Sequence, residues 1–144
     1  MSESVRPSKE EVIAFMEAQH PHTVHATLGI RTVQADAECF VLELDVSERL
    51  FQHAGLVHGG IYVLLAESAA SGAAALTVDV SQQRVAGQEI SASHVRGATA
   101  GTLRAEARPL HVGRTAIVYG VEVRNDGVLV SVVRCTIAVR AIRG

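Results

Sequence analysis

The sequence GLVHGGIYVLLAESAASGAAA, residues 55–75, decides the fold of this chain. It begins with His58 and two glycines and continues through small and apolar residues around one carboxylate, Glu67. It lacks the period-2 alternation of a strand and is rich in helix formers, which predicts a helix from about residue 59 to residue 77. Apolar residues surround this helix on almost every side, as expected of a central buried helix. A lone carboxylate in such a helix requires an explanation, because burying an unpaired charge is costly.

Length and composition set the class of protein. The chain has 144 residues, 48% of them hydrophobic, and a net charge of −2. It is long enough for one hydrophobic core, so we expect one domain over residues 1–144, with residues 1–27 as an N-terminal helical segment. The charge argues against nucleic acid as a partner.

The N-terminal residues MSESVRPSKEEV are polar and show no signal peptide. Polar residues also interrupt the central helix, which argues against a membrane span. The sequence therefore predicts a cytoplasmic protein with no membrane partner.

The flanking sequence predicts the remaining elements. Ser8 and Glu11 form a capping box that predicts a helix to about Gln19. Short strands are expected over residues 28–33 and 40–47, and four more over residues 85–95, 102–112, 115–124 and 128–140. No crossover helix separates the last four, so we expect an antiparallel meander. An antiparallel sheet wrapped around one long central helix is the α+β arrangement called the hotdog fold.

Other chemistry-bearing residues have simple interpretations. Cys39 and Cys135 each lie in an apolar, strand-like run, which favours buried free thiols. Three histidines are close together at positions 20, 22 and 25, but Pro21 interrupts any helix there and no acid or cysteine accompanies them. We therefore predict no metal and no cofactor.

The start of the central helix can carry chemistry. Gly59 and Gly60 offer free backbone N–H groups at the positive end of the helix dipole, which suits an oxyanion, although glycines there could also serve only tight packing. Glu67 could be a general base, a nucleophile or a structural carboxylate. Ser71, one turn further on, could hold a water or only cap its own i−4 carbonyl.

Spacing along this helix indicates two subunits. Gly59 and Glu67 are eight residues apart, or about 12 Å along an α-helix, so one substrate carbonyl cannot touch both groups of one chain. A second, antiparallel copy could bring its Glu67 beside Gly59. If both groups act on one bond, a dimer with shared active sites is required.

The motif Gln52-(x5)-His58-Gly59-Gly60-(x6)-Glu67-(x3)-Ser71 resembles the active-site segment of hotdog-fold thioesterases of the PaaI type. The similar branch contains the soil-bacterial 4-hydroxybenzoyl-CoA thioesterase, the enterobactin-pathway proofreading enzyme and the dihydroxynaphthoyl-CoA enzyme of the menaquinone pathway. The resemblance extends from about residue 28 to residue 140.

The resemblance implies a thioester hydrolase that acts on acyl-CoA. The Gly59 N–H would polarise the thioester carbonyl, supported by Gln52 and His58. Glu67 of the opposite subunit would be nucleophile or base, and Ser71 would position the water. Substrate-binding residues implied in the same way are Gly60, His94, Arg96, Arg114, Thr115 and Arg140.

His94 matches a histidine that contacts the acyl group in the enterobactin and menaquinone enzymes, where the 4-hydroxybenzoyl enzyme has an aromatic residue. The arginines match positions near the nucleotide and phosphates of coenzyme A. The resemblance therefore implies an aromatic or hydroxyaroyl-CoA substrate and a homo-oligomer, a dimer or the tetramer common in the family. Two alternatives stay open: a proofreading enzyme that acts on misacylated carrier proteins, and a non-catalytic module that binds acyl-CoA.

Overall fold

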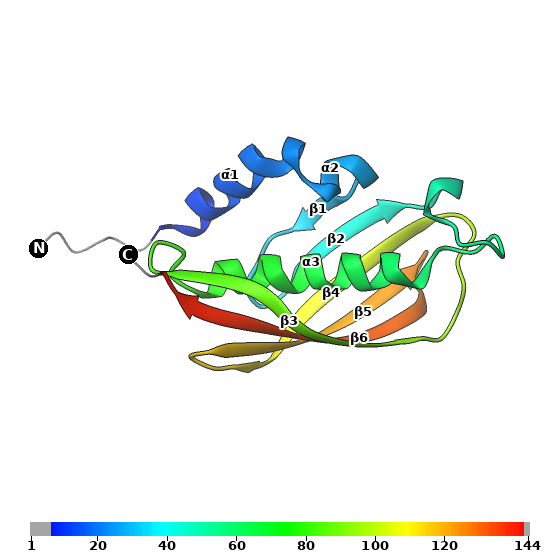
Figure 1. Cartoon of the computed structure of the whole chain (residues 1–144). Coiled ribbons are helices and arrows are strands. Elements are labelled where there is room, and N and C mark those ends of the chain that lie inside the picture. The colour runs from blue at the N-terminus through cyan, green and yellow to red at the C-terminus, as the bar shows by residue number, and fades with distance from the viewer. Residues whose placement is uncertain (1–6, 143–144) are drawn as a thin grey trace, which may run out of the picture.

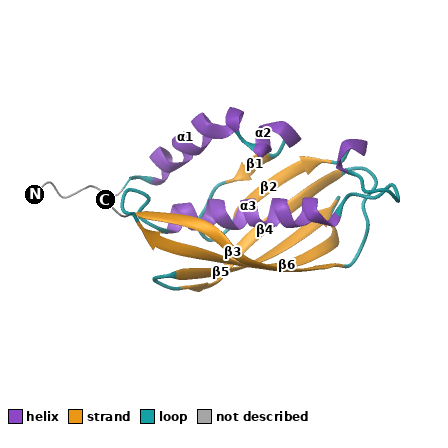
Figure 2. Ribbon diagram, viewed as in Figure 1, coloured by secondary structure: helices purple, strands orange, loops and turns teal. Residues whose placement is uncertain are grey.

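A long helix lies in the hollow of a curved antiparallel sheet, as the computed structural model shows for residues 7–142 (Figures 1 and 2). The predicted helix 59–77 is confirmed at both ends as α3 (Gly59–Thr77). The other elements are α1 (Lys9–Gln19), η1 (His20–His22), α2 (Val24–Leu28), β1 (Arg31–Gln34), β2 (Phe40–Asp45), η2 (Glu48–Leu50), β3 (Gln83–His94), β4 (Thr102–Val112), β5 (Ala116–Asn125) and β6 (Val128–Ala141). Residues 1–6 and 143–144 of the predicted domain lie outside the described residues.

The sheet order is β1-β2-β4-β5-β6-β3, with every neighbouring pair antiparallel. The expected meander is correct for β4, β5 and β6 but wrong for β3. That strand pairs with β6 from Gln83↔Ala141 to His94↔Ser131, at the far edge of the sheet. The 14 residues of β6 pair with β5 on one side and β3 on the other. The resulting curved sheet contacts α3 through the five strands β2 to β6.

Small residues on α3 let the sheet approach it closely. The helix buries alanines 66, 69, 70, 73 and 74 together with Tyr62, Leu65 and Gly72. The facing strands alternate buried and less buried residues, as in the buried Leu103, Ala105 and Ala107 of β4. By length and composition α3 would also qualify as a membrane-spanning helix, but the core helix of a globular domain passes the same test.

Two local sequence signals have the structures they predict. Glu11 N–H donates to Ser8 Oγ at 3.2 Å and Ser8 N–H donates to Glu11 Oε2 at 2.7 Å, which completes the capping box of α1. The sequence Asn125-Asp126-Gly127 is the second, a signal for a hairpin turn, and Asp126 and Gly127, with φ values of 46° and 84°, form the turn between β5 and β6.

The first strand begins later than expected. Residues 24–28 form the short helix α2, which ends at Gly29 with a left-handed φ of 80°, and β1 therefore starts only at Arg31. A single turn of helix carries no periodic pattern long enough to be distinguished from a strand.

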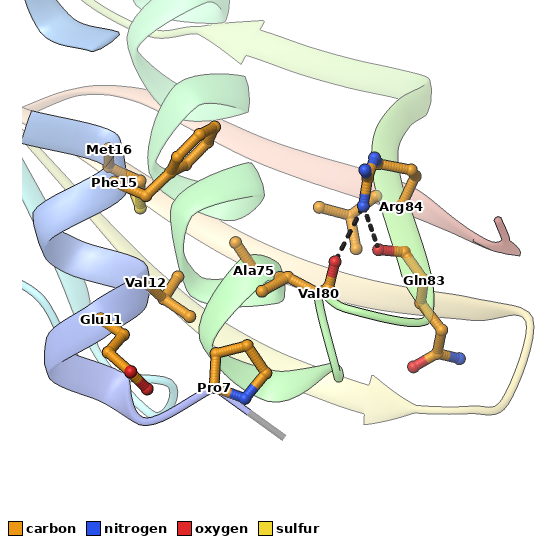
Figure 3. Close-up of a pocket in the computed structure, with 10 residues that line it drawn as sticks. Pro7, Glu11, Val12, Phe15, Met16, Ala75, Val80, Gln83 and Arg84 are labelled. Atoms are coloured by element: carbon orange, nitrogen blue, oxygen red, sulfur yellow. Dashed lines mark hydrogen bonds between the residues drawn. The ribbon is translucent and has the colours of Figure 1, made fainter. Parts of the chain in front are cut away.

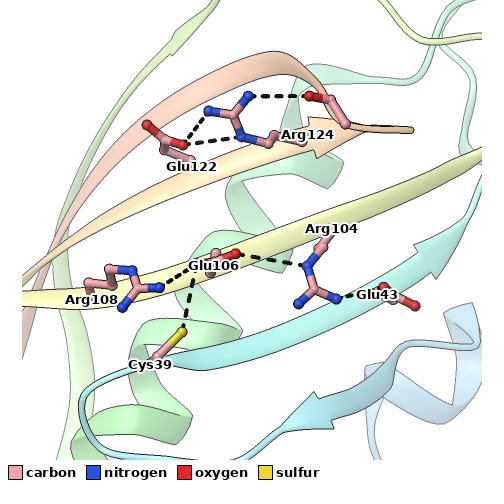
Figure 4. A network of polar contacts seen from close by, with 8 residues as sticks. Cys39, Glu43, Arg104, Glu106, Arg108, Glu122 and Arg124 are labelled. Carbon is pink, nitrogen blue, oxygen red and sulfur yellow. Dashed lines mark hydrogen bonds and ion pairs between the residues drawn. The ribbon is translucent and has the colours of Figure 1, made fainter.

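Ion pairs cover the outer face of the sheet (Figure 4). The Arg104 guanidinium lies between the carboxylates of Glu43, at 2.8 Å, and Glu106, at 3.8 Å. Arg108 pairs with Glu106 at 2.7 Å, and the Cys39 thiol lies 3.8 Å from the same carboxylate. Exposed pairs of this kind contribute little to stability individually, so the packing around α3 dominates.

Candidate active site

The N-terminus of α3 is capped by the residue before it. His58 Nδ1 accepts a hydrogen bond of 2.8 Å from the Gly60 N–H. The expectation that both glycine N–H groups are free is therefore wrong for Gly60, because an imidazole two residues back satisfies it. The Gly59 N–H has no acceptor within residues 7–142 and stays available at the positive end of the helix.

The imidazole of His94, at the end of β3, packs directly on Gly59. A Cβ atom at Gly59 would lie 2.7 Å from both Cδ2 and Nε2 of His94, so only glycine fits this position without displacing the ring. Tyr62, one turn into α3, contacts the same ring edge-on with centroids 5.3 Å apart. The structure thus brings together two of the predicted residues, Gly59 and His94, that are 35 positions apart in the sequence.

Gln52 lies in the tight loop that leads into α3. Its side-chain oxygen accepts from the Ala54 N–H, and its backbone N–H donates to the Leu56 carbonyl at 2.8 Å. The His58 N–H donates to the Leu50 carbonyl at 2.8 Å, which anchors the loop to the preceding turn. Gln52 and His58 therefore lie in one hydrogen-bonded loop at the helix start.

Glu67 lies in the middle of α3 and is half-buried. A methyl group on Gly87 of β3 would overlap its Oε1 atom, so the carboxylate occupies the space beside the Gly87 backbone where a side chain would be. The register of β3 shifts between Gly87 and Glu89, a bulge of the kind common beside active sites. Within residues 7–142 this carboxylate has neither a hydrogen-bond donor nor an ion-pair partner.

Ser71 shares the helix face of Glu67 and is also half-buried. In the described chain its hydroxyl makes no hydrogen bond, whereas Thr77 of the same helix bonds to the carbonyl four residues back at 2.9 Å. The capping alternative for Ser71 is therefore not what the structure shows.

The predicted site residues fall into three places in one protomer. The first is the helix-start cluster of Gln52, His58, Gly59, Gly60 and His94, with Arg96 just beyond β3; the second is Glu67 with Ser71; the third is Arg114, Thr115 and Arg140. Arg140 donates to the Thr115 carbonyl at 3.1 Å and to Gln88 Oε1 at 3.3 Å.

The third place lies at the opposite end of the β3–β6 pair from the first. Arg140 is the register partner of Arg84, and Ser131 is that of His94, so about 33 Å of strand separates the two ends. Arg96, Arg114 and Arg140 of one protomer therefore cannot all contact the nucleotide of the same coenzyme A molecule.

Two cavities lie beneath α1, with volumes of about 620 and 540 Å³. Figure 3 shows the first, between α1, the end of α3 and the start of β3, with Val12, Phe15 and Ala75 pointing into it. The second is lined by Ser68, next to Glu67, but neither is lined by a predicted site residue. The N-terminal helix thus covers α3 rather than the outer face of the sheet (Figure 1).

No group of three histidine, cysteine or acidic residues that could hold a metal ion is found within residues 7–142. Two residues in contact with the predicted site were missed by the sequence interpretation, Gly87 and Ser131. Ser131 is the only serine, threonine or charged residue classed as buried in the described chain. A single hydroxyl within the apolar run of β6 was the signal that could have identified it.

Replacing Gly87 with alanine is expected to lower kcat by roughly 10- to 100-fold, because the added methyl displaces the Glu67 carboxylate and small misplacements of a reacting group are costly. The free energy of unfolding should change little, since the displaced atom is the end of a flexible side chain. Gly120→Ala on β5 is the matched control, because its Cβ would meet nothing closer than 3.4 Å. Equal kcat values in the two variants would contradict this placement of Glu67.

Comparison with known proteins gives the family. Residues 54–132, more than half of the chain, match the family model described as "Thioesterase superfamily". The 1,4-dihydroxy-2-naphthoyl-CoA hydrolase of Listeria monocytogenes is 36% identical over 79% of this chain and 93% of its own length. The proofreading thioesterase EntH of Klebsiella pneumoniae is 35% identical over 82% of this chain and 85% of its own.

Solved structures agree with this. A crystal structure of a mutant of the thioesterase PA1618 from Pseudomonas aeruginosa superimposes with a TM-score of 0.83, at 35% identity over 96% of this chain and 98% of that one. The fold and the helix-start cluster define a hotdog thioesterase, and the chain belongs to the thioesterase superfamily. It is a thioester hydrolase of the acyl-CoA class.

Proposed function

We propose that this enzyme hydrolyses aromatic or hydroxyaroyl-CoA thioesters to the free acid and coenzyme A, at sites shared between two copies of the chain. The observation that carries the proposal is the separation of two unsatisfied groups on one helix. The Gly59 N–H lacks an acceptor and the Glu67 carboxylate lacks a partner within residues 7–142, yet about 12 Å of α3 lies between them.

The reaction assigns a role to each group. The thioester carbonyl oxygen accepts from the Gly59 N–H, which stabilises negative charge as the carbonyl carbon becomes tetrahedral. Glu67 of the second copy either removes a proton from water, whose oxygen attacks that carbon, or attacks it directly to form an anhydride that water then hydrolyses. The C–S bond breaks, the sulfur leaves as thiolate and takes up a proton, and the acyl group leaves as a carboxylate. Ser71, with its hydroxyl unengaged, positions the water.

The edge of the sheet supports a shared site. β3 is an edge strand of 12 residues, and a long unpaired edge is a template for pairing with another chain. Antiparallel pairing of two β3 edges would set the Gly87 end of one copy toward the His94 end of the other. It would also bring Arg114, Thr115 and Arg140 of one copy toward Arg96 and the helix-start cluster of the other, where they would contact the phosphates of coenzyme A. We propose the dimer as the catalytic unit, within the tetramer common in the family.

The aromatic preference rests on two supports. The printed name of the Listeria monocytogenes relative specifies a dihydroxynaphthoyl-CoA substrate. In this chain an exposed imidazole, His94, lies beside the N–H that would hold the thioester carbonyl, where it can contact an acyl group.

We also propose that residues 1–144 work as one domain in the cytoplasm.

A carrier-protein substrate is the second candidate, favoured by the 35% identity to the proofreading thioesterase EntH. It uses the same chemistry but a different leaving group. Comparing kcat/KM for the same acyl group on coenzyme A and on a phosphopantetheinyl carrier protein separates the two, since the preferred leaving group gives the higher value.

Thiol release, followed with a disulfide reporter across a panel of acyl-CoAs, tests the proposal. The panel runs from acetyl to palmitoyl and includes benzoyl, 4-hydroxybenzoyl, phenylacetyl and 1,4-dihydroxy-2-naphthoyl thioesters. We expect kcat/KM to be highest among the aromatic members and to vanish in Glu67→Ala. A maximum among the long aliphatic chains would overturn the aromatic preference, and slow release unaffected by Glu67→Ala would overturn the mechanism.

The cysteines of the enzyme itself should not react with the disulfide reporter in this assay. Burial raises the pKa of the Cys135 thiol to about 11, with the Glu67 and Glu89 carboxylates adding to the shift, and burial also raises the pKa of Cys39. At pH 8 the thiolate fraction of Cys135 is therefore on the order of one in a thousand. We expect the native protein to give no reporter signal over an assay and the unfolded protein to give 2 thiols per chain. Rapid labelling of the native protein would contradict the buried placement of these thiols.

A further inference from the structure

Ser131 lies at the junction of the core and the candidate active site. It belongs to β6, is fully buried, and is the register partner of His94 on the neighbouring strand. Its hydroxyl is 2.9 Å from His94 Nδ1 and donates to the Ser93 carbonyl at 3.3 Å. A buried hydroxyl with both bonds made to one strand end is a fixed element, because it has no water to exchange with.

These two hydrogen bonds determine which nitrogen of His94 carries the proton. A serine hydroxyl has one proton, and the Ser93 carbonyl can only accept, so both contacts are hydrogen bonds at once only if that proton goes to the carbonyl. The oxygen lone pairs then accept from His94, so the neutral imidazole carries its proton on Nδ1. Nε2 is left with a lone pair and acts only as an acceptor.

The position of this lone pair is tightly defined. Nε2 would be 2.7 Å from a Cβ on Gly59, and Tyr62 packs edge-on against the same ring. The acceptor thus lies beside the one N–H of the helix start that has no partner in the described chain. His58 has the opposite arrangement, because its Nδ1 accepts from Gly60 and its proton is consequently on Nε2.

We propose that Ser131 is a positioning residue that fixes the Nδ1-protonated form of His94. Nε2 then accepts a hydrogen bond from a hydroxyl group of the substrate, carried on the ring carbon adjacent to the one that bears the thioester. The inference rests on the proposed function and narrows its substrate class. An acyl group with a hydroxyl at the adjacent ring carbon satisfies both the Gly59 N–H, through its carbonyl oxygen, and the Nε2 lone pair. An unsubstituted benzoyl group leaves the lone pair without a donor.

The protonation of His94 can be measured without any change to the site. In the intact enzyme labelled with ¹⁵N-histidine, long-range ¹H–¹⁵N spectra at pH 8.5 distinguish protonated from unprotonated ring nitrogens, and His94→Gln identifies the signal. We expect the His94 proton on Nδ1 in the wild type and a shift of population toward Nε2 in Ser131→Ala. A proton on Nε2 in the wild type overturns the proposal, and this result does not depend on the folding of Ser131→Ala.

Substrate discrimination is the second readout. The ratio of kcat/KM for 2-hydroxybenzoyl-CoA to that for benzoyl-CoA should fall about tenfold in Ser131→Ala, the effect of one lost hydrogen bond. Ser131→Thr keeps the hydroxyl and should keep the ratio. Ser91→Ala on β3, where the serine is exposed, is the matched control and should leave the ratio unchanged. An unchanged ratio in Ser131→Ala overturns the role of Ser131 in specificity.

Failure of the proposed function gives a different pattern. If acyl-CoAs are not hydrolysed, or if Glu67→Gln turns them over normally, the catalytic proposal fails while the NMR result for His94 still stands. If hydrolysis depends on Glu67 but the ratio is unaffected by Ser131→Ala, only the inference about Ser131 fails.

Discussion

Replacing Glu67 with glutamine is expected to reduce kcat by roughly 10²- to 10⁴-fold, the range for loss of a positioned base or nucleophile. Glutamine has the shape of glutamate, so it fills the same space against Gly87 without a carboxylate to take a proton or to attack. The free energy of unfolding should not fall, because in the described chain the carboxylate makes no hydrogen bond or ion pair that the amide would lose. Steady-state kinetics with the best substrate of the panel, together with urea denaturation, measures both effects.

Subunit mixing extends this prediction to the shared site. Gly59→Val should also be inactive, because its side chain would collide with the His94 ring, 2.7 Å from the position of a Cβ. In a heterodimer of Glu67→Gln and Gly59→Val, one shared site carries both defects and the other carries neither. Random re-association of equal amounts should therefore restore roughly a quarter of wild-type activity, given half heterodimers with one intact site in two. Persistent inactivity of the mixture would mean that each site uses Gly59 and Glu67 of the same chain.

Replacing Gly72 with valine is expected to destabilise the protein by about 3 kcal/mol, the upper range for overpacking a core. A Cβ at Gly72 would lie 2.6 Å from Cζ of Phe40, and the Phe40 ring is only 1% exposed, so the valine side chain and the ring compete for the same buried space. Intrinsic helix propensity has the opposite sign, since glycine in a helix interior is less favourable than most residues. Urea denaturation at fixed protein concentration measures the change.

A second substitution separates steric conflict from other causes. Phe40→Leu removes the ring atoms that would meet the valine, so Gly72→Val should cost less in the Phe40→Leu background than in the wild type. The coupling free energy of this double-mutant cycle should be on the order of 1 kcal/mol or more, as for residues in contact. Simple additivity would show that the cost of Gly72→Val comes from somewhere other than Phe40.

The sequence was sufficient wherever the determining interaction is local. The bounds of α3 follow from a run of helix formers between His58 and Thr77, and the capping box of α1 and the turn at Asp126–Gly127 involve residues within three positions of one another. The spacing from Gly59 to Glu67 is likewise a property of one helix, and it predicts a second copy of the chain if both groups act on one bond.

Only the tertiary structure decided which strand closes the sheet and what surrounds the site. β3 pairs with β6 because the sheet must curve around α3 to bury it. No local sequence pattern within β3 indicates this pairing. The contacts of His94 with Gly59 and Ser131, and of Glu67 with Gly87, join residues 20 or more positions apart. Sequence patterns report on neighbours along the chain, whereas the proton on His94 and the environment of Glu67 are set by atoms that meet only when the sheet wraps around the helix.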